Sequence, residues 1–549
     1  MSKNISYLTG KKHPTDNLFE QISRAAEDGT PSKEALKALA DSFLVGEAST
    51  YGTATFYDFL KPENKGKTVY VCNGSACLCA GTQDQLARTI EKHVPAEKIG
   101  HMTCLGRCHE NGAFHFNGHN YSNLSESEIE ALLTKTAAPK KDQYRVGHLG
   151  TPVLTADWGE PEAIYGLLAK ALELGPEAVL DEIITANVRG RGGAGFPMGF
   201  KLEACKKAKG KRKFIVCNAD EGDPGAYTDR YLLEERPHLV LLGMIIAGFV
   251  TGAEWGIVYI RGEYPESVSV VESAVREIAS RGFTGEHILG SDFNFHFKVI
   301  RAQGAYICGE ETALLSSIEG QRPEVRIRPP YPVEQGLFNE PTVVNNVETL
   351  ATIPYILKHG GAQYRALGTE KSSGTKLMSL DSSFHFPGVY EVEMGTPLSK
   401  VVYELGGGFR RKVKALHIGG PLCGLVPVSK IEDLTVDFES FRKEGFMLGH
   451  ASVVGIPETF PIIEYLEHLF AFTAAESCGK CFPCRLGSVR GQELLHKARH
   501  SDFKIDRQLF DDLVDTLEKG SLCALGGGLP LPVKNALMHF SEELASYFA

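Results

Sequence analysis

The pattern of apolar and polar positions divides the chain into stretches of different character. The first sixty residues show helical periodicity. Short apolar strands at 67–72 and 99–104, a helix near 82–93 and a hairpin near 113–122 then predict a small α/β unit. A polar, proline-containing stretch at 136–143 is typical of a linker.

From about 157 to 367, helical stretches alternate with short apolar strands, which predicts a layered α/β domain. Residues 374–429 are rich in strands and Gly/Pro turns and predict a small β-rich insert, whereas the pattern is helical from about 457 onward. The uncharged run at 239–253 is shorter than the ~18–20 apolar residues of a membrane helix. It predicts a buried helix that leads into a strand at 256–260.

Length and composition limit the classes of protein to consider. A chain of 549 residues exceeds what one core normally serves, so we expect about three or four domains. The hydrophobic share of 43% excludes wholesale disorder, and the net charge of −10 argues against a nucleic-acid binder. The polar N-terminus lacks the apolar core of a secretory signal, so we expect a soluble, cytoplasmic protein.

Thirteen cysteines in such a chain are expected to be metal ligands or inert core residues rather than disulfides. Near the C-terminus, Cys478, Cys481 and Cys484 follow one another at two-residue gaps, and Cys523 lies downstream. Four thiolates in this pattern suit a [4Fe–4S] cluster. A structural zinc site is the alternative, although zinc more often uses two separated C-x₂-C pairs.

A second cysteine group lies near the N-terminus. Cys72 and Cys77 form one pair and Cys104 and Cys108 another, each after a predicted strand, which suits a [2Fe–2S] cluster with two thiolates per iron. On spacing alone, Cys79 could replace Cys77. Three nearby histidines are interpreted as surface or hairpin residues rather than Rieske ligands: His109, His115 and His119.

Three central segments are candidates for a small-molecule site. The glycine-rich stretch 189–197, with Lys201 beyond it, could bring backbone N–H groups close to phosphate, but it does not follow a strand. The acidic segment 218–225 follows a strand, where small-molecule sites often lie, although it could be a solvated turn. Glu310 and Glu311 stand at the start of an apolar helix, where they could simply favour the helix dipole.

Taken in order, these segments resemble a known family. The motifs GRGGAGFPMGFK, NADEGDPGAYTDR, GAYICGEETALLSSIEG, PTVVNNVETL and ESCGKCFPCRLG resemble the NADH-binding flavoprotein subunit of respiratory complex I, from about Asp157 to the C-terminus. The N-terminal motifs VCNGSACLCAG and CLGRC resemble its thioredoxin-like [2Fe–2S] subunit. Such a fusion is similar to the diaphorase subunits of soluble NAD-linked formate dehydrogenases and NAD-reducing hydrogenases.

The resemblance implies a multidomain α/β fold with four parts. N-terminal helices and a thioredoxin-like [2Fe–2S] domain would occupy residues 1–136, and an α/β FMN- and NADH-binding domain residues 150–370. A small β-grasp (ubiquitin-like) insert would follow at 371–450. A C-terminal helical bundle with the [4Fe–4S] cluster would occupy 451–549.

The resemblance also implies the residues of the cofactor site. The residues expected near FMN are Gly190, Gly192, Lys201, Asn218, Asp220, Tyr306, Gly309, Glu310, Asn345 and Asn346. Those expected near NADH are the aromatic residues Phe196 and Tyr331 at the adenine and the acids Asp223 and Glu311 near the riboses. A carboxylate there would repel the extra phosphate of NADPH, so NAD is the expected nucleotide.

Three departures from the family pattern stand out. The segment 202–207 lacks a second aromatic residue after the lysine, which would weaken adenine stacking. Asp223 stands where complex I commonly has glutamate. The gap between Cys77 and Cys104 is short, as if a small hairpin were missing from the [2Fe–2S] domain.

The function implied is hydride transfer between NADH and FMN without a catalytic side chain. One-electron transfer through the [4Fe–4S] cluster, with the [2Fe–2S] cluster as a second outlet or reservoir, would follow. The terminal substrate requires a large partner subunit. We favour a molybdenum formate dehydrogenase over a hydrogenase, possibly with a small [2Fe–2S] subunit, and electron bifurcation remains open. Membrane complex I is less expected, because its two subunits are normally separate. A non-enzymatic iron–sulfur scaffold is the alternative.

Overall fold

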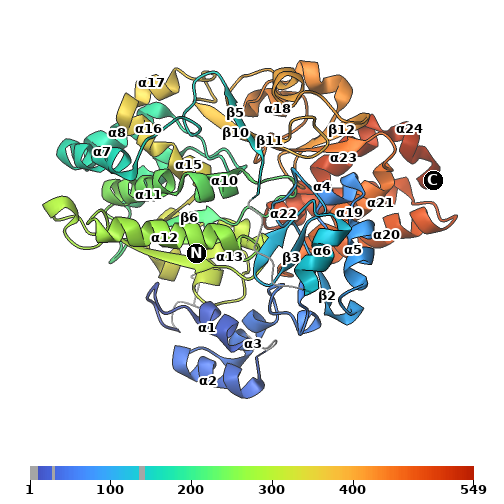
Figure 1. The fold of residues 1–549 in the computed structure, drawn as a ribbon, viewed down its shortest axis with the longest axis horizontal. Coiled ribbons are helices and arrows are strands. Elements are labelled where there is room, and N and C mark those ends of the chain that lie inside the picture. The colour runs from blue at the N-terminus through green and yellow to red at the C-terminus, as the bar shows by residue number, and fades with distance from the viewer. Residues whose placement is uncertain (1–9, 27–30, 135–141) are drawn as a thin grey trace.

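The computed structural model describes residues 10–26, 31–134 and 142–549 (Figure 1). The chain begins with three helices that lie together at one end of the molecule: α1 (Leu18–Ala25), α2 (Lys33–Phe43) and α3 (Glu47–Ala54). They are attached to the centre of the molecule by buried hydrogen bonds. The Asn17 side chain donates to the Ile318 carbonyl at 3.2 Å, and the hydroxyls of Tyr57 and Ser317 lie 2.6 Å apart.

The N-terminal unit that follows is built on a four-stranded sheet of order β2-β1-β3-β4. Its strands are β1 (Val69–Cys72), β2 (Ile99–Met102), β3 (Phe114–Phe116) and β4 (His119–Tyr121), with helices α4 (Ser75–Ala80), α5 (Gln83–Glu91) and α6 (Glu126–Thr134). β1 is parallel to β2 and antiparallel to β3. Val71, Ile90 and Phe114 form its small core. The predicted strand, helix, strand and hairpin are all present.

The central unit contains a parallel sheet of order β8-β7-β6-β9. Its strands are β6 (Phe214–Ala219), β7 (Trp255–Ile260), β8 (His296–Arg301) and β9 (Thr342–Asn346). Its helices include α7 (Pro161–Leu174), α8 (Pro176–Ala186), α9 (Met198–Lys207), α10 (Thr228–Glu235), α11 (Pro237–Thr251), α12 (Pro265–Ser280), α13 (Glu311–Ile318), α14 (Pro332–Gln335), α15 (Val347–Ala351), α16 (Ile353–His359) and α17 (Gly361–Arg365). Alternate residues of β6 enter two different cores, Ile215 on the side of α11 and Val216 on the side of α13, as expected for a sheet covered on both faces.

Helix α11 confirms the buried helix expected from the uncharged run, because nearly all of its residues are buried. In the described part of the chain, no helix has the length and apolar character needed to cross a membrane.

The inserted sheet has the order β13-β12-β14-β10-β11-β5. Its strands are β5 (Arg145–Leu149), β10 (Thr375–Leu380), β11 (Gly388–Glu393), β12 (Val413–Ile418), β13 (Leu425–Pro427) and β14 (Ser452–Pro457). The first and last strands of the insert, β10 and β14, pair in parallel at its centre, and each is flanked by an antiparallel neighbour. This arrangement is the predicted β-grasp topology. β5 adds an edge strand parallel to β11, from a segment well before the insert.

The C-terminal unit is helical, with α19 (Ile462–Glu476), α20 (Ser488–His500), α21 (Arg507–Gly520), α22 (Ala524–Gly528), α23 (Pro530–His539) and α24 (Ser541–Leu544). Helices α19 and α20 approach closely at Gly491, where a Cβ atom would lie 2.1 Å from the ring of Phe470. A side chain at this position would therefore force the two helices apart.

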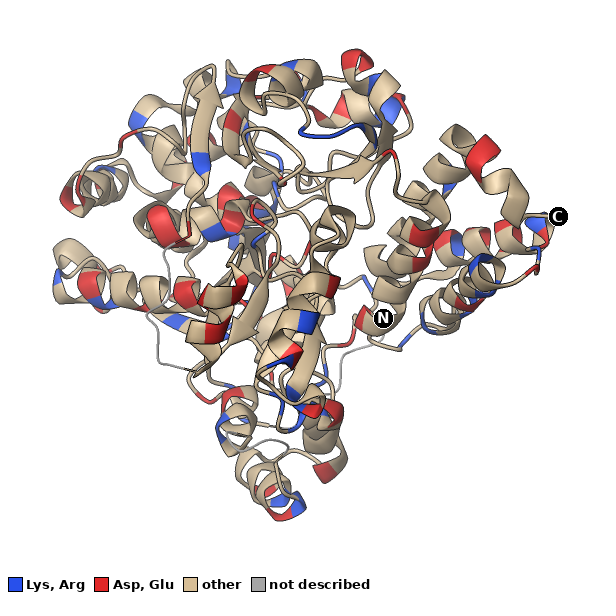
Figure 2. Ribbon diagram, turned by 45° about the vertical axis from the view of Figure 1, so that its right-hand side comes forward, with Lys and Arg blue, Asp and Glu red and all other residues tan. Residues whose placement is uncertain are grey.

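Basic and acidic residues are interspersed along the helices (Figure 2). The linker predicted at 136–143 falls largely outside the described residues, but Asp142 at its end is an anchor. Its carboxylate lies 2.5 Å from the guanidinium of the fully buried Arg230, 3.3 Å from Arg107 and 2.8 Å from His109. His109 is only 3% exposed, so its interpretation as a surface or hairpin residue is wrong; its hydrogen bond with Asp142 compensates for its burial. His115 and His119 do lie on the β3–β4 hairpin.

Candidate functional site

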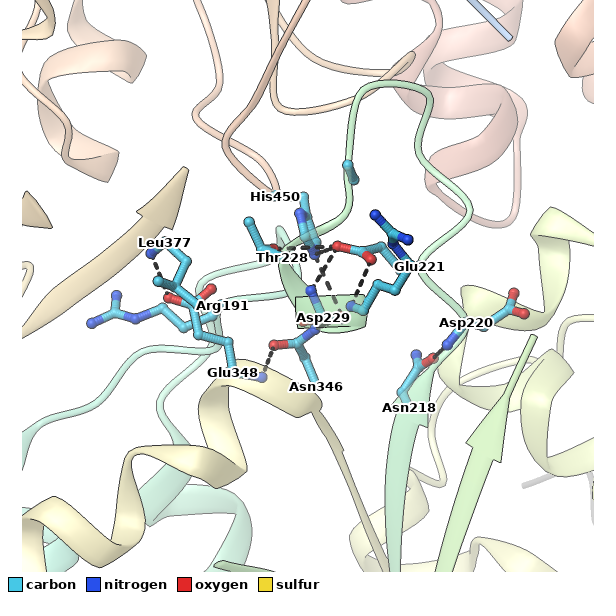
Figure 3. Close-up of polar contacts among 12 residues, drawn as sticks. Arg191, Asn218, Asp220, Glu221, Thr228, Asp229, Asn346, Glu348, Leu377 and His450 are labelled. Carbon is cyan, nitrogen blue, oxygen red and sulfur yellow. Dashed lines mark hydrogen bonds and ion pairs between the residues drawn. The ribbon is translucent and has the colours of Figure 1, made fainter. Parts of the chain in front are cut away.

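The site begins where two neighbouring strands of the parallel sheet end, one inside the sheet and one at its edge. β6 and β9 are neighbours, and Asn218 pairs in register with Asn346 at their carboxyl ends. The Asp220 amide donates to the Asn218 side chain at 3.2 Å, and the Asn346 side chain caps α15 by accepting from the amides of its first turn. Figure 3 shows these side chains at the strand ends. The carboxyl edge of such a sheet is where small molecules usually bind.

The glycine-rich segment closes the site from the side of β9. The Gly190 amide donates to the Phe196 carbonyl at 2.8 Å, so residues 190–196 form a tight loop. At Gly192 a Cβ atom would lie 3.0 Å from the Asn346 Cβ, and Gly193 has a φ of +118°, which favours glycine. The loop therefore depends on its glycines to approach the strand end.

The third segment lies opposite this loop. The Asn218 side chain donates to the Gly309 carbonyl at 2.8 Å, which fixes the turn before α13. One oxygen of Glu310 caps α13 by accepting from the Thr312 and Ala313 amides. This oxygen therefore stabilises the start of the helix, as the alternative interpretation of Glu310 expects. Its other oxygen lies 3.6 Å from Arg328 and makes no hydrogen bond within the described residues.

Polar atoms without protein partners mark the space between these segments. Asp220 Oδ2 and Asn345 Nδ2 are buried and make no hydrogen bond to any residue that the structure describes. Burial raises the pKa of Asp220 well above its usual value, and Arg261 only partly opposes this shift. These two atoms lie unpaired at the carboxyl edge of the same sheet, one as an acceptor and one as a donor. They fit a ligand that carries both hydrogen-bond donors and acceptors, as FMN does.

The acidic segment and Tyr306 form the neighbouring wall. The Tyr306 hydroxyl donates to Asp223 Oδ1 at 2.7 Å. Burial raises the pKa of Asp223, while His450 and the Tyr306 hydrogen bond lower it. Lys201 donates to the Val344 carbonyl at 3.0 Å and to Glu311 at 3.2 Å.

Exposed aromatic side chains lie on the glycine loop, on α9 and directly before α14. The exposed fractions of Phe196, Phe200 and Tyr331 are 46%, 59% and 53%, which is unusual for large apolar side chains. The rings of Phe196 and Phe200 meet edge to face with centroids 5.5 Å apart. No aromatic residue was expected to join Phe196 in this segment, but Phe200, directly before Lys201 on α9, presents a second exposed ring. Its signal in the sequence is its place within the motif GRGGAGFPMGFK.

The four C-terminal cysteines gather at one place. Cys478 and Cys484 are buried in the core that also contacts Cys481 and Cys523, and the Cys484 thiol donates to the Ser477 hydroxyl at 3.3 Å. Helix α22, which starts directly after Cys523, packs so closely that a Cβ at Gly526 would lie 2.7 Å from Cys484 Cβ.

The N-terminal cysteines form two close pairs. The sulfurs of Cys104 and Cys108 lie 3.5 Å apart, and a hydrogen bond from Cys77 lowers the pKa of Cys72 to about 7. The Cys79 thiol instead lies among the charged groups of Asp381, Arg411 and Glu464, which act on its pKa. The geometry therefore favours Cys77 as the partner of Cys72.

Both cysteine groups connect to the central site through single hydrogen bonds. The Gly225 amide, at the end of the acidic segment, donates to the Cys108 sulfur at 3.2 Å. The Tyr306 amide donates at 2.8 Å to Glu476, two residues before Cys478. The acidic segment and Tyr306 thus stand between the two cysteine groups.

Comparison with known proteins gives three matches to family models. The Nuo51 FMN-binding domain matches residues 183–355, the NADH-ubiquinone oxidoreductase-F iron-sulfur binding region residues 464–547, and the thioredoxin-like [2Fe-2S] ferredoxin residues 6–137.

Individual relatives agree with these matches. The F 2 subunit of the NADH-quinone oxidoreductase of Rhizobium meliloti is 41% identical over 387 residues, 70% of this chain and 92% of that protein. The alpha subunit of the NAD-reducing hydrogenase HoxS of Cupriavidus necator is 38% identical over 69% of this chain and 62% of its own length. A chain of a crystal structure of an NAD+-reducing [NiFe]-hydrogenase in the H2-reduced state superimposes with a TM-score of 0.87 at 29% identity, covering 98% of this chain and 93% of that chain.

Proposed function

The chain belongs to the family of NADH-binding FMN subunits of complex I-like enzymes and NAD-reducing hydrogenases, and from that premise we propose which residues carry its electron transfer and which partner it serves. The family-model and structure matches confirm three predictions from sequence: the family, the multidomain α/β fold, and the cofactors FMN, NAD(H), [2Fe–2S] and [4Fe–4S]. The chain is an NADH oxidoreductase. The domain boundaries and individual site residues remain predictions.

We assign the FMN site to the carboxyl edge of the central sheet. The unpaired atoms of Asp220 and Asn345 would bind polar groups of the flavin, and Gly192 and Gly309 would leave room for it. The loop 190–196 would turn its backbone toward the phosphate, with Lys201 nearby as a cation. The remaining residues that we propose for the site are Gly190, Asn218, Tyr306, Glu310 and Asn346.

NADH would bind over the open side of this site. Phe196, Tyr331 and the additional Phe200 are exposed there and would hold the adenine by stacking. Asp223 and Glu311 would accept hydrogen bonds from ribose hydroxyls and disfavour the phosphate of NADPH. NAD specificity remains a proposal, since one relative is an NADP-reducing hydrogenase subunit, HndC of Solidesulfovibrio fructosivorans.

No side chain has to act as an acid or base in this assignment. Bound FMN supplies two-electron chemistry with the nicotinamide and one-electron chemistry with iron–sulfur clusters. The residues of the chain orient the two ring systems and keep the clusters within reach. The observation that carries the proposal is the position of residues 220–225 and Tyr306, which connect to Cys108 on one side and to the Cys478 segment on the other.

We assign the [4Fe–4S] cluster to Cys478, Cys481, Cys484 and Cys523, and the [2Fe–2S] cluster to the pairs Cys72–Cys77 and Cys104–Cys108. No disulfide forms among the thirteen cysteines, all of which are described, as suits a reducing, cytoplasmic compartment.

The partner would dock beside the [4Fe–4S] site. Phe482, Leu486 and Val489 are exposed at i, i+4 and i+7 spacing, and Leu522 is exposed directly before Cys523. An apolar stripe at the mouth of an electron-transfer centre suits a protein partner. The likeness over nearly the whole chain to a subunit of an NAD+-reducing hydrogenase favours a hydrogenase-type partner over the formate dehydrogenase preferred from sequence. Nickel or molybdenum in the co-purified large subunit decides between them.

The route itself is tested with Cys481→Ser. NADH should still bleach the flavin band of this variant, while electron delivery to the partner falls to background. Full delivery from a variant that lacks the [4Fe–4S] signal would overturn the route. A wild-type protein whose bound FMN is not bleached by NADH would overturn the proposed function as a whole and favour a non-enzymatic scaffold.

A further inference from the structure

A buried histidine and two carboxylates lie directly behind the proposed flavin site (Figure 3). His450 lies two residues before β14, the last strand of the β-grasp insert, and only 4% of its surface is exposed. Its Nε2 lies 3.4 Å from Glu221 Oε1 and 3.5 Å from Asp229 Oδ2. Neither ring nitrogen makes a hydrogen bond of good geometry to the described residues, so both acids act on the imidazole mainly through their charge.

This group touches three segments of the flavin site. Glu221 directly follows Asp220. Asp229 Oδ2 accepts from the Asn346 side chain at 2.6 Å. A Cβ atom at Gly193, in the glycine-rich loop, would lie 4.0 Å from the His450 backbone nitrogen. A change of charge in the flavin site would therefore be felt by His450 and its partners.

The surrounding charges favour a proton on this group. Burial alone would lower the pKa of His450, but Asp229 and Glu221 outweigh burial and raise it to about 9. Burial and Asp229 raise the pKa of Glu221 to about 8. The titratable and charged groups that face the cluster from the elements packed against it are Asp223, Tyr264, Arg261 and Lys376.

The contacts argue against a metal ion in this group. The two oxygens of Glu221 already accept from the Asp229 amide at 2.8 Å, the Arg230 amide at 3.1 Å and the Thr228 hydroxyl at 3.2 Å. Few lone pairs are left for a cation, whereas a proton shared with His450 requires no further ligand.

We propose that His450, Glu221 and Asp229 form a redox-linked proton site, which in alkaline solution takes up one proton from solvent when the flavin in the adjacent site gains two electrons. This inference rests on the proposed FMN site. The electrons come from NADH or a chemical reductant, and the proton compensates for the negative charge added to a buried pocket. Because like charge disfavours ionised carboxylates and favours a charged imidazole, reduction strengthens proton binding at this site.

The test is the midpoint potential of bound FMN between pH 6 and 9. Over this range only the reduced flavin ring loses a proton, so the flavin itself makes the slope against pH shallower as pH rises. A neighbouring site that gains its proton on reduction makes the slope steeper above about pH 8, where the oxidised protein begins to lose that proton. We expect about 30 mV more per pH unit there, which is one proton per two electrons.

His450→Gln should abolish the steeper section. Glu221→Gln keeps the acceptor for the Thr228 hydroxyl and should alter the same section, so it serves if the first variant fails to fold. The matched control is His417→Gln, another buried histidine, which bonds to Tyr465 and should leave the steeper section in place. A wild-type slope that never steepens, or a His450→Gln profile equal to wild type, would overturn the inference. Either result would leave NADH-dependent bleaching, and thus the proposed function, intact.

Discussion

Tyr306→Phe is the substitution that tests most directly how the nucleotide wall is built. It removes the hydroxyl that donates to Asp223 at 2.7 Å while leaving the ring in place. A hydrogen bond to a charged group contributes about 1.5–3 kcal/mol, or roughly 10- to 140-fold in affinity. Because both side chains are only partly buried, we expect the lower end, a weakening of NADH binding by about tenfold.

The same substitution should change the pH dependence of NADH binding. Asp223 must be ionised to accept from ribose hydroxyls, so affinity is present above its pKa and lost as pH falls through it. Burial already raises this pKa and the Tyr306 hydroxyl lowers it, so its loss moves the acid limb to higher pH.

Stopped-flow bleaching of the flavin at varied NADH and pH measures both effects. The control is Tyr465→Phe, which removes a buried tyrosine hydroxyl that bonds to His417 instead. Asp223→Asn should weaken binding by a similar factor, and the double variant by little more. Unchanged affinity and an unmoved acid limb in Tyr306→Phe would refute the placement of Asp223 against the nucleotide.

Three further predictions concern the clusters, the partner and the fold. Cys77→Ser should lose the [2Fe–2S] EPR signal and Cys79→Ser should keep it. The opposite result would show that Cys79, and not Cys77, is the cluster ligand. Phe482→Asp should weaken binding of the partner by about 30-fold, which corresponds to an interface hot spot of about 2 kcal/mol. Titration with the purified partner measures this affinity, and NADH oxidation by a small dye should stay unchanged. Lys376→Met leaves Glu348 as a fully buried, unpaired charge and should lower the free energy of unfolding by about 3–5 kcal/mol, as measured by thermal unfolding. Adding Glu348→Gln should restore part of this free energy. A Lys376→Met variant as stable as wild type would contradict the buried ion pair.

Much of the site was predictable because its signals are local in sequence. The two cysteine pairs follow β1 and β2 closely, and polar residues follow β6 and end β9, so chain geometry alone brings each set to one edge. The choice between Cys77 and Cys79 depends on helix α4, which carries both. It turns the Cys77 thiol toward Cys72 and the Cys79 thiol toward Asp381 and Arg411.

The remaining features depend on contacts between distant segments. His450 reaches the acidic segment across more than two hundred residues, and no motif marks it, because a buried histidine is recognisable only by its partners. The edge strand β5 pairs with β11 although its sequence, RVGHL, is short and largely exposed. Asp142 resembles a linker residue until Arg230 is placed against it.

The segment from Asp220 to Gly225 links three centres that sequence treats as separate. Asp220 faces the proposed flavin site and Asp223 the proposed nucleotide side, and the Gly225 amide donates to the sulfur of Cys108, a proposed cluster ligand. Gly225 has a φ of +102°, and a Cβ there would lie 2.6 Å from a methyl group of Val454, so the backbone cannot relax around a side chain. Arg261 ties the segment to the [2Fe–2S] loop, because its guanidinium donates both to the Glu221 carbonyl at 2.6 Å and to the Thr103 carbonyl at 3.1 Å. A substitution in this segment should therefore change flavin binding, nucleotide binding and the surroundings of the [2Fe–2S] cluster at the same time. An assay of one of these properties has to be accompanied by assays of the other two.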